Sequence, residues 1–199
     1  MWDSYKKGYK AYLQLERSLS DNSVEAYIRD LEKLTQYLQA TGQLKSPAEI
    51  QLKDLQDFVR WIAELGMNAA SQSRVVSGIR NFFKYCVLEN IVTKDASVLL
   101  DTPKLSRKLP DVLSFEEIER IISQVDVSTA DGARNKAILE TMYSCGLRVS
   151  ELVNLKISCF YPDIGFVRVI GKGDKERLVP IGRDAIKFIR IYKDQVRVH

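Results

Sequence analysis

The chain has 199 residues, of which 45% are hydrophobic and 28% charged, a composition that excludes a disordered protein and suits one large or two small domains. Its net charge of +4 arises entirely from residues 104–199, because residues 1–103 contain 13 basic and 13 acidic side chains. No segment reaches the roughly 18–20 apolar residues of a membrane span and no signal-peptide core is present, so we expect a cytoplasmic protein with no membrane partner. Three cysteines without paired spacing and a single histidine, His199, exclude a histidine-based metal site and a Ser-His-Asp triad.

Residues 1–103 have the pattern of an all-helical domain. Asn22 followed by Glu25 has the spacing of a capping box and predicts a helix that begins at Asn22 and ends at Gly42. The segment 46–49, Ser-Pro-Ala-Glu, predicts the start of a second helix, because proline is favoured in the first helical turn.

A third helix is predicted over residues 69–89, and its polar face is the most informative of this domain. Small side chains on such a face allow close approach to a DNA backbone, and long basic ones reach phosphates or base edges. An ordinary solvated face is the alternative interpretation. The candidate DNA-binding residues on this helix are Ser73, Arg74, Arg80 and Lys84.

A basic linker is predicted at residues 104–110. Two flanking prolines disfavour helix and keep this segment extended. Lys104, Arg107 and Lys108 make it suitable for crossing a DNA groove, although a plain soluble linker has a similar composition. We therefore expect a helical DNA-binding domain at 1–103 and a second domain at 111–199.

The second domain is predicted to begin with helices. Ser114 and Glu117 form a second capping box, and a further helix over residues 132–143 is followed by Gly146. Arg148 then opens a new helix. Three apolar side chains of that helix are expected to point inward: Leu152, Val153 and Leu155.

A β-hairpin and a last helix are predicted next. Residues 166–170 and 177–181 are rich in β-branched side chains and are separated by a glycine-rich segment, as in an antiparallel hairpin. A final helix is expected after Gly182.

Two cations in this domain suit phosphate chemistry. Arg148 at a helix start combines a guanidinium with unpaired backbone N–H groups, although a surface arginine paired with Glu151 is the alternative. Lys172 lies between Gly171 and Gly173, where an ammonium group can neutralise a phosphate or protonate an alkoxide. An exposed hairpin tip is the competing interpretation of Lys172.

Four segments of the sequence closely resemble the Xer group of tyrosine site-specific recombinases, which belongs to the phage-integrase superfamily. Residues 19–31 and 73–85 resemble helices of its core-binding domain, residues 146–152 (Gly-Leu-Arg-Val-Ser-Glu-Leu) resemble its first catalytic-arginine motif, and residues 171–177 resemble its catalytic-lysine hairpin. The resemblance implies an all-α, SAM-like core-binding domain followed by part of an α+β catalytic domain with a small antiparallel sheet.

The resemblance also implies roles for individual residues. Arg148 would bind the non-bridging oxygens of the scissile phosphate, Lys172 would protonate the 5′-hydroxyl leaving group, and Glu151 would support the site. Lys175 and Arg177 would contact DNA. A tyrosine would form a 3′-phosphotyrosyl link, and no metal or cofactor is needed because the covalent intermediate retains the phosphodiester energy.

One departure from the family bears on activity. The family's His-x-x-Arg segment and nucleophilic tyrosine lie downstream of the hairpin and have no counterpart here, so we expect a C-terminally truncated chain that binds DNA without cleaving it.

The implied partners are a double-stranded recombination site, a homo- or hetero-tetramer with a partner recombinase, and a DNA translocase as activator. The implied role is chromosome-dimer resolution; an integrase of a mobile element and a non-catalytic DNA-binding module are the alternatives.

Overall fold

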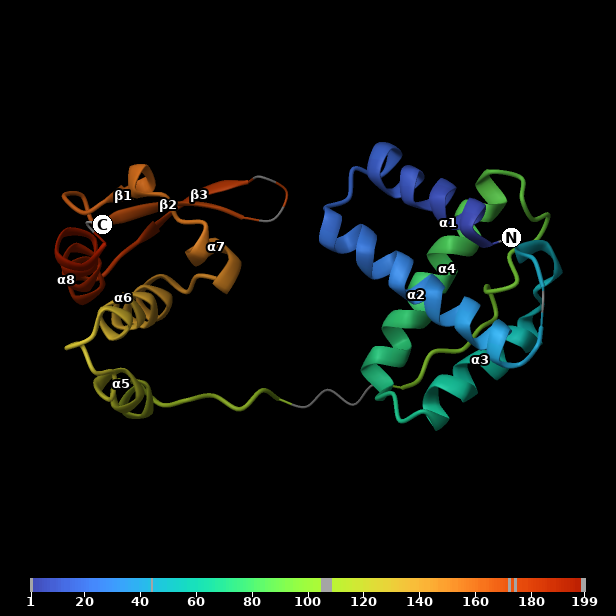
Figure 1. The fold of residues 1–199 in the computed structure, drawn as a ribbon, viewed down its shortest axis with the longest axis horizontal. Coiled ribbons are helices and arrows are strands. Elements are labelled where there is room, and N and C mark those ends of the chain that lie inside the picture. The colour runs from blue at the N-terminus through green and yellow to red at the C-terminus, as the bar shows by residue number, and fades with distance from the viewer. Residues whose placement is uncertain (1, 44, 105–108, 172, 174, 198–199) are drawn as a thin grey trace. The chain divides into compact units, whose positions relative to one another are not determined.

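The computed structural model forms two compact units, Met1–Lys108 and Leu109–His199 (Figure 1). It describes residues 2–43, 45–104, 109–171, 173 and 175–197. Within these ranges, none of the helices combines the length and the apolar character needed to cross a membrane.

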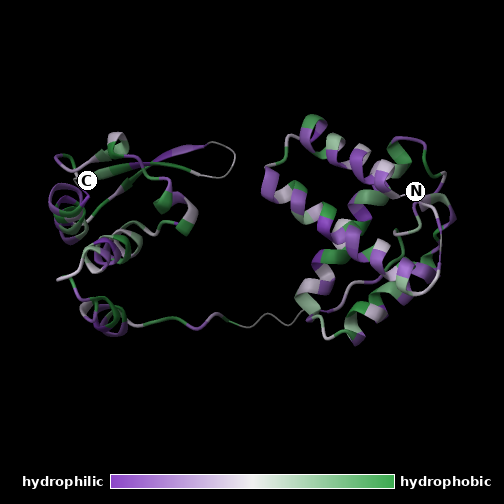
Figure 2. Cartoon of the chain, in the orientation of Figure 1, coloured by the Kyte–Doolittle hydropathy of each residue, from purple (hydrophilic) through white to green (hydrophobic). Residues whose placement is uncertain are grey.

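The first unit is entirely helical, as predicted. Its elements are α1 (Trp2–Ala11), a π-helical turn (Tyr12–Glu16), α2 (Asp21–Ala40), a 3-10 turn (Pro47–Glu49), α3 (Leu52–Glu64) and α4 (Ala69–Leu88). Hydrophobic and hydrophilic residues alternate along each helical ribbon, as expected for helices that bury one face (Figure 2). The buried faces meet in one core, whose largest fully buried members include Tyr9, Leu34, Phe58, Phe82 and Phe83.

The start of α2 differs from the sequence prediction. The helix begins at Asp21, and Ser20 has the extended backbone of a capping residue (φ −62°, ψ 150°). The Ser20 and Ser23 hydroxyl oxygens lie 3.0 Å apart, whereas Glu25 faces Arg29 at 3.9 Å. The predicted capping box at Asn22 and Glu25 is therefore wrong, because the carboxylate pairs forward along the helix instead of returning to its start.

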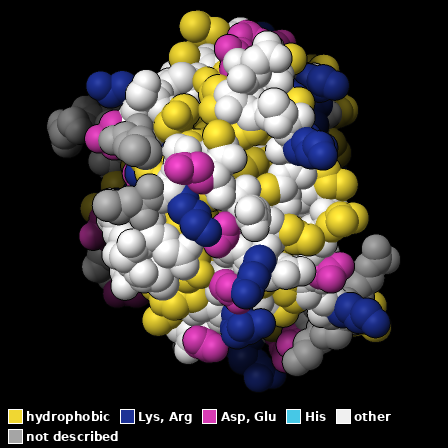
Figure 3. Space-filling model, turned by 90° about the vertical axis from the view of Figure 1, so that its right-hand side faces the viewer, with side chains coloured by type: hydrophobic (Ala, Val, Ile, Leu, Met, Phe, Trp, Pro, Cys, Tyr) yellow, Lys and Arg dark blue, Asp and Glu magenta, His cyan; other side chains and the backbone are white. Residues whose placement is uncertain are grey.

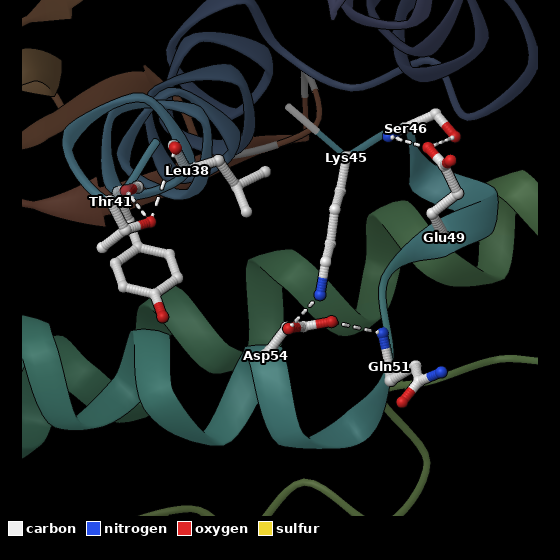
Figure 4. A network of polar contacts seen from close by, with 8 residues as sticks. Leu38, Thr41, Lys45, Ser46, Glu49, Gln51 and Asp54 are labelled. Atoms are coloured by element: carbon white, nitrogen blue, oxygen red, sulfur yellow. Dashed lines mark hydrogen bonds and ion pairs between the residues drawn. The ribbon is translucent and has the colours of Figure 1, made fainter. Parts of the chain in front are cut away.

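The start signal at Ser46 is real but caps a shorter element than expected (Figure 4). The Glu49 carboxylate accepts hydrogen bonds from the Ser46 backbone N–H and hydroxyl group, both at 2.7 Å, around the 3-10 turn. The longer helix α3 begins after Gln51, whose backbone N–H donates to Asp54 Oδ2 at 2.9 Å. Lys45 Nζ lies 2.5 Å from Asp54 Oδ1 and ties the preceding loop to this helix start.

The second unit combines helices with a small sheet, which confirms the predicted fold class. Its elements are α5 (Phe115–Ser123), α6 (Ala130–Cys145), α7 (Val149–Val153), a 3-10 turn (Ile157–Cys159), β1 (Phe160–Tyr161), β2 (Phe166–Ile170), β3 (Glu176–Pro180), α8 (Arg183–Ile191) and a π-helical turn (Tyr192–Val196). The strands follow the order β1-β2-β3 and both pairings are antiparallel. The predicted hairpin is thus present, whereas the short strand β1 was not predicted.

Local signals place the helix ends of this unit as the sequence indicated. The Ser114 backbone N–H donates to Glu117 Oε2 at 2.7 Å, and the Glu117 N–H donates back to Ser114 Oγ at 3.2 Å, which completes the predicted capping box at α5. Gly146 ends α6 in the left-handed region (φ +58°), where glycine is favoured.

The core of the second unit lies where the sheet meets the neighbouring helices, and its buried members are Cys145, Leu147, Val167, Val169, Ile181 and Ala185. Leu152 and Leu155 pack against it, as predicted. Val153 is not among the residues packed against this core, and it is 69% exposed.

Candidate functional site

Arg148 occupies the capping position at the start of α7. The left-handed turn at Gly146 reverses the chain after α6, and Leu147 is buried in the core, so that the next residue is presented at the surface. The Arg148 side chain is 74% exposed. A cation with this exposure at a helix start can meet an anion from solvent together with the backbone N–H groups of the first turn.

Glu151 holds two arginines with one buried carboxylate. Its side chain is only 4% exposed, and it accepts hydrogen bonds from the Arg148 backbone N–H at 2.9 Å and from Arg148 Nη1 at 3.1 Å. Arg177 donates to both carboxylate oxygens, from Nη1 and Nη2, at 2.9 Å each. The Arg177 hydrogen bonds and the Arg148 N–H lower the pKa of Glu151 from 4.5 to about 2. The Arg148–Glu151 pair that the sequence offered as the alternative interpretation therefore exists, and it leaves Arg148 accessible.

The register of the hairpin explains how Arg177 reaches Glu151. Arg177 pairs with Val169 in the β2–β3 ladder, so both side chains lie on the face of the sheet that also carries the buried Val167. A Cβ at Gly171 would lie 2.9 Å from Arg177 Nη1, so glycine leaves the space that this guanidinium occupies. The sequence prediction gave Arg177 a DNA contact and missed this pairing, although strand alternation placed it on the core-facing side.

A surface cavity of about 440 Å³ opens beside this cluster. Its lining includes three basic side chains, Arg148, Lys156 and Arg168, and one carboxylate, Glu151. Such a set favours an anionic ligand, and the guanidinium of Arg148 matches the geometry of phosphate oxygens. No tyrosine is among its lining residues in the part of the chain that the structure describes.

The predicted general acid, Lys172, lies outside the described residues. The ends of its loop are described: the Gly171 N–H donates to the Lys175 carbonyl oxygen at 2.8 Å, and Gly173 has a φ of +74°. Lys175 is exposed. The roles given to Lys172 and Lys175 stay predictions.

Two of the four DNA-binding candidates on α4 have partners within their own unit. Arg74 Nη1 and Nη2 donate to the Asp30 carboxylate at 2.7 and 2.5 Å, and Arg80 Nη2 donates to the Leu100 carbonyl oxygen. Lys84 is exposed and Ser73 is half-buried. The DNA contacts of these four residues stay predictions. On the face of the molecule drawn in Figure 3, basic and acidic side chains are interspersed with hydrophobic ones.

The linker candidates are only partly described. Lys104 is exposed. Arg107 and Lys108 lie outside the described residues, and a DNA contact by any of the three stays a prediction.

Two family models match the chain in succession. "Phage integrase, N-terminal SAM-like domain" matches residues 7–90, and "Phage integrase family" matches residues 111–198. Curated relatives include "Tyrosine recombinase XerD" of Oceanobacillus iheyensis, 39% identical over 186 residues, and "Tyrosine recombinase XerD" of Staphylococcus aureus, 37% identical over 189 residues. These alignments cover 94% and 95% of this chain but 62% and 64% of the relatives. The chain therefore spans less than two thirds of their length.

Solved structures show the same fold. A lambda integrase dimer bound to a core site matches with a TM-score of 0.75 and 18% identity, covering 96% of this chain and 66% of that one. The XerH site-specific recombinase, bound to its palindromic difH substrate, matches with a TM-score of 0.68 and 22% identity, covering 94% and 57%. With both halves matched in order by the family's two models, and with XerD relatives aligned along nearly its whole length, the chain belongs to the phage integrase family, as its arginine and lysine motifs predicted.

Proposed function

We propose that this chain acts in site-specific DNA recombination, with the first unit binding duplex DNA and the cavity beside Arg148 holding the scissile phosphate. This proposal rests on the exposed Arg148, which the buried Glu151 binds through an ion pair. Lys156 and Arg168 line the same cavity. Preorganised donors of this kind stabilise the charge that develops on phosphate oxygens during transfer. The XerD relatives support the same class of reaction.

The proposed chemistry is an exchange of phosphodiester bonds. A tyrosine hydroxyl releases its proton to solvent as its oxygen forms a bond to phosphorus. The bond to the 5′-oxygen breaks, and Lys172 supplies the proton that the departing oxygen takes up. Arg148 donates to the non-bridging oxygens throughout. Because no tyrosine lies among the described lining residues of the cavity, we propose that this chain, by itself, binds DNA without forming the covalent link.

The proposed partners are a recombination site in double-stranded DNA and further recombinase subunits. The structural relatives include a lambda integrase dimer bound to a core site and a lambda integrase tetramer bound to a Holliday junction, which supports a multimer on DNA as the working form. We also propose a cytoplasmic location, which rests on the sequence patterns described above. Chromosome-dimer resolution as the biological role and activation by a DNA translocase are proposed from the sequence resemblance alone.

A gel-shift titration tests the proposal. The probe is a duplex of roughly 30 base pairs, about three helical turns, that bears a Xer-type palindromic site, with a scrambled duplex as control and two salt concentrations. We expect site-preferring binding that weakens with salt, and Arg148→Ala to lower affinity about tenfold through loss of a charge-assisted phosphate contact. Arg190→Ala is the matched control, since Arg190 is also an exposed, ion-paired arginine of this unit.

Two results would contradict the proposal. Equal or absent binding to both duplexes would remove the assignment of DNA recognition to this chain. A protein–DNA adduct that survives denaturing electrophoresis with a nicked site would overturn the statement that this chain binds without covalent capture.

A further inference from the structure

The first unit buries a carboxylate at the contact between α2 and α4. The Asp30 side chain is 1% exposed, which is rare for an aspartate unless it is paired. Its two oxygens accept hydrogen bonds from both terminal nitrogens of Arg74, 44 residues along the chain, and Lys33 Nζ lies 3.9 Å away. Burial raises the pKa of Asp30 while Arg74 opposes this rise, so the arginine is the main compensation for the buried charge.

Gly78 makes the close approach of the two helices possible. It lies one turn after Arg74 on α4, and a Cβ at this position would lie 2.5 Å from Asp30 Oδ2 and 2.9 Å from Asp30 Cβ. A side chain larger than glycine therefore cannot occupy this position without moving Asp30. The geometry around the carboxylate is thus fixed from the helix that carries Arg74.

Arg74 is held at its end but remains accessible. Its side chain is 51% exposed, and Asp30 is its only hydrogen-bond partner among the residues that the structure describes. A guanidinium bound end-on to a carboxylate keeps further N–H groups that can donate to another anion. Exposed Ser77 and Lys84 lie along the same helix, so the accessible part of Arg74 belongs to a surface that also offers small and basic side chains.

Building on the proposed DNA binding, we propose that Asp30 is a positioning residue that fixes the Arg74 guanidinium for contact with a backbone phosphate of the DNA site. A free arginine loses side-chain entropy when it binds, at a cost of about 0.5–1.5 kcal/mol for an immobilised long side chain. Asp30 lowers this entropy cost of binding, because it holds the Arg74 guanidinium in one orientation before DNA binds. Asp30 therefore favours binding although its own charge repels DNA.

The sign of this effect separates positioning from simple electrostatics. Removing a negative charge near DNA strengthens binding and leaves the number of phosphate contacts unchanged. Removing a positioning carboxylate weakens binding through Arg74. The two mechanisms thus predict opposite changes for Asp30→Asn, a substitution of nearly equal size that lacks the charge and the second acceptor oxygen.

The test is a duplex-binding titration at several salt concentrations with wild type, Asp30→Asn, Arg74→Ala, Arg74→Lys and the Asp30→Asn/Arg74→Ala double variant. We expect Asp30→Asn to weaken binding about two- to tenfold, the equivalent of the ordering cost restored. Arg74→Ala should reduce the slope of log K against log salt by about 0.9, the value for one phosphate contact. In the double variant, Asp30→Asn should cause no further loss. Arg74→Lys keeps the positive charge and the fold but lacks the guanidinium that donates from two nitrogens to Asp30. It should therefore also weaken binding.

Controls keep the outcome interpretable. Trp2 and Trp61 are the only tryptophans of the chain and both lie in the first unit, so their fluorescence confirms that each variant is folded. Arg60→Gln is the matched surface variant, since Arg60 is an exposed arginine of α3 with its own aspartate partner. Stronger binding by Asp30→Asn, or additive losses in the double variant, would overturn the positioning role alone. Absence of salt-dependent duplex binding by wild type would overturn this role and the proposed function together.

Discussion

The two units each bury one carboxylate against arginine, and the consequences for the two carboxylates are opposite. Asp30 has one bidentate arginine and a pKa that burial raises, whereas Glu151 has two arginines and a backbone N–H donor and a pKa of about 2. For Asp30, desolvation by burial is the largest cause and Arg74 opposes it, whereas for Glu151 the hydrogen bonds from Arg177 and the Arg148 N–H outweigh desolvation. The balance between desolvation and hydrogen-bond donors therefore sets the direction of each pKa shift.

The apolar cores of the two units also differ. The first unit buries a continuous core in which four helices take part, whereas the buried cluster between the sheet and helices of the second unit has six members among the described residues. Polar contacts such as the Glu151 cluster therefore contribute a larger part of the folding stability of the second unit. Three substitutions test this contrast.

The largest effect is expected from the first core. Phe83 is fully buried on α4, and Phe83→Ala should lower the free energy of unfolding of the first unit by about 3–5 kcal/mol through lost burial and a residual cavity. Urea unfolding followed by tryptophan fluorescence measures this unit selectively, because both tryptophans belong to it. Val98→Ala, at a 66% exposed side chain, is the control and should change little. A loss below 1 kcal/mol for Phe83→Ala would contradict the described packing.

An intermediate effect is expected at the helix contact. A glycine-to-alanine change inside a helix ordinarily stabilises by about 0.5–1 kcal/mol. Gly78→Ala should instead destabilise by about 1–3 kcal/mol, because the new Cβ meets Asp30. Combining it with Asp30→Ala removes the 2.5 Å contact with Asp30 Oδ2 but keeps the 2.9 Å contact with Asp30 Cβ, so it should restore only part of the loss. Ser77→Ala on the exposed side should stay within about 0.5 kcal/mol. A stabilising Gly78→Ala would show that α2 and α4 are farther apart than described.

The smallest effect is expected from the second carboxylate, and it depends on pH. Since the pKa of Glu151 is lowered to about 2 in the folded chain, its contribution to stability is complete above its ordinary pKa of 4.5 and is lost as the pH falls toward 2. Glu151→Gln should therefore lower the melting temperature of the second unit at pH 6 but not at pH 2, as followed by the NMR methyl signals of Val167 and Val169. Glu176→Gln, at a half-exposed glutamate that faces Arg168, is the control. An equal difference at both pH values would contradict the ionised Glu151 cluster.

The sequence predicted the parts of the fold that depend on local signals. The Ser114–Glu117 box, the glycine after α6 and the alternation of the β2–β3 hairpin all act within a few residues, and all are present. The weak point was the choice between neighbouring capping residues, as at Ser20, where several polar side chains compete within one turn.

The sequence could not predict which polar side chains meet across the fold. Arg74 and Arg80 were identified as members of one polar face, but their partners Asp30 and Leu100 lie 44 and 20 residues away. Likewise Arg148 and Glu151 were found by their spacing, whereas the contribution of Arg177 depends on the sheet register. Pair contacts of this kind need the tertiary arrangement of the helices and strands, which periodicity does not contain.

The hairpin register also limits how this part of the protein can change in evolution. Neighbouring residues of a strand face opposite sides, so one residue inserted within β3 would send Arg177 to the outer face, where Arg168 and Glu176 lie, and would leave Glu151 without its bidentate partner. An insertion between Gly171 and Lys175, which are joined by a backbone hydrogen bond at the mouth of the loop, leaves the ladder unchanged. Length variation among related chains should therefore accumulate in the loop, while the number and order of residues in β3 stay constant.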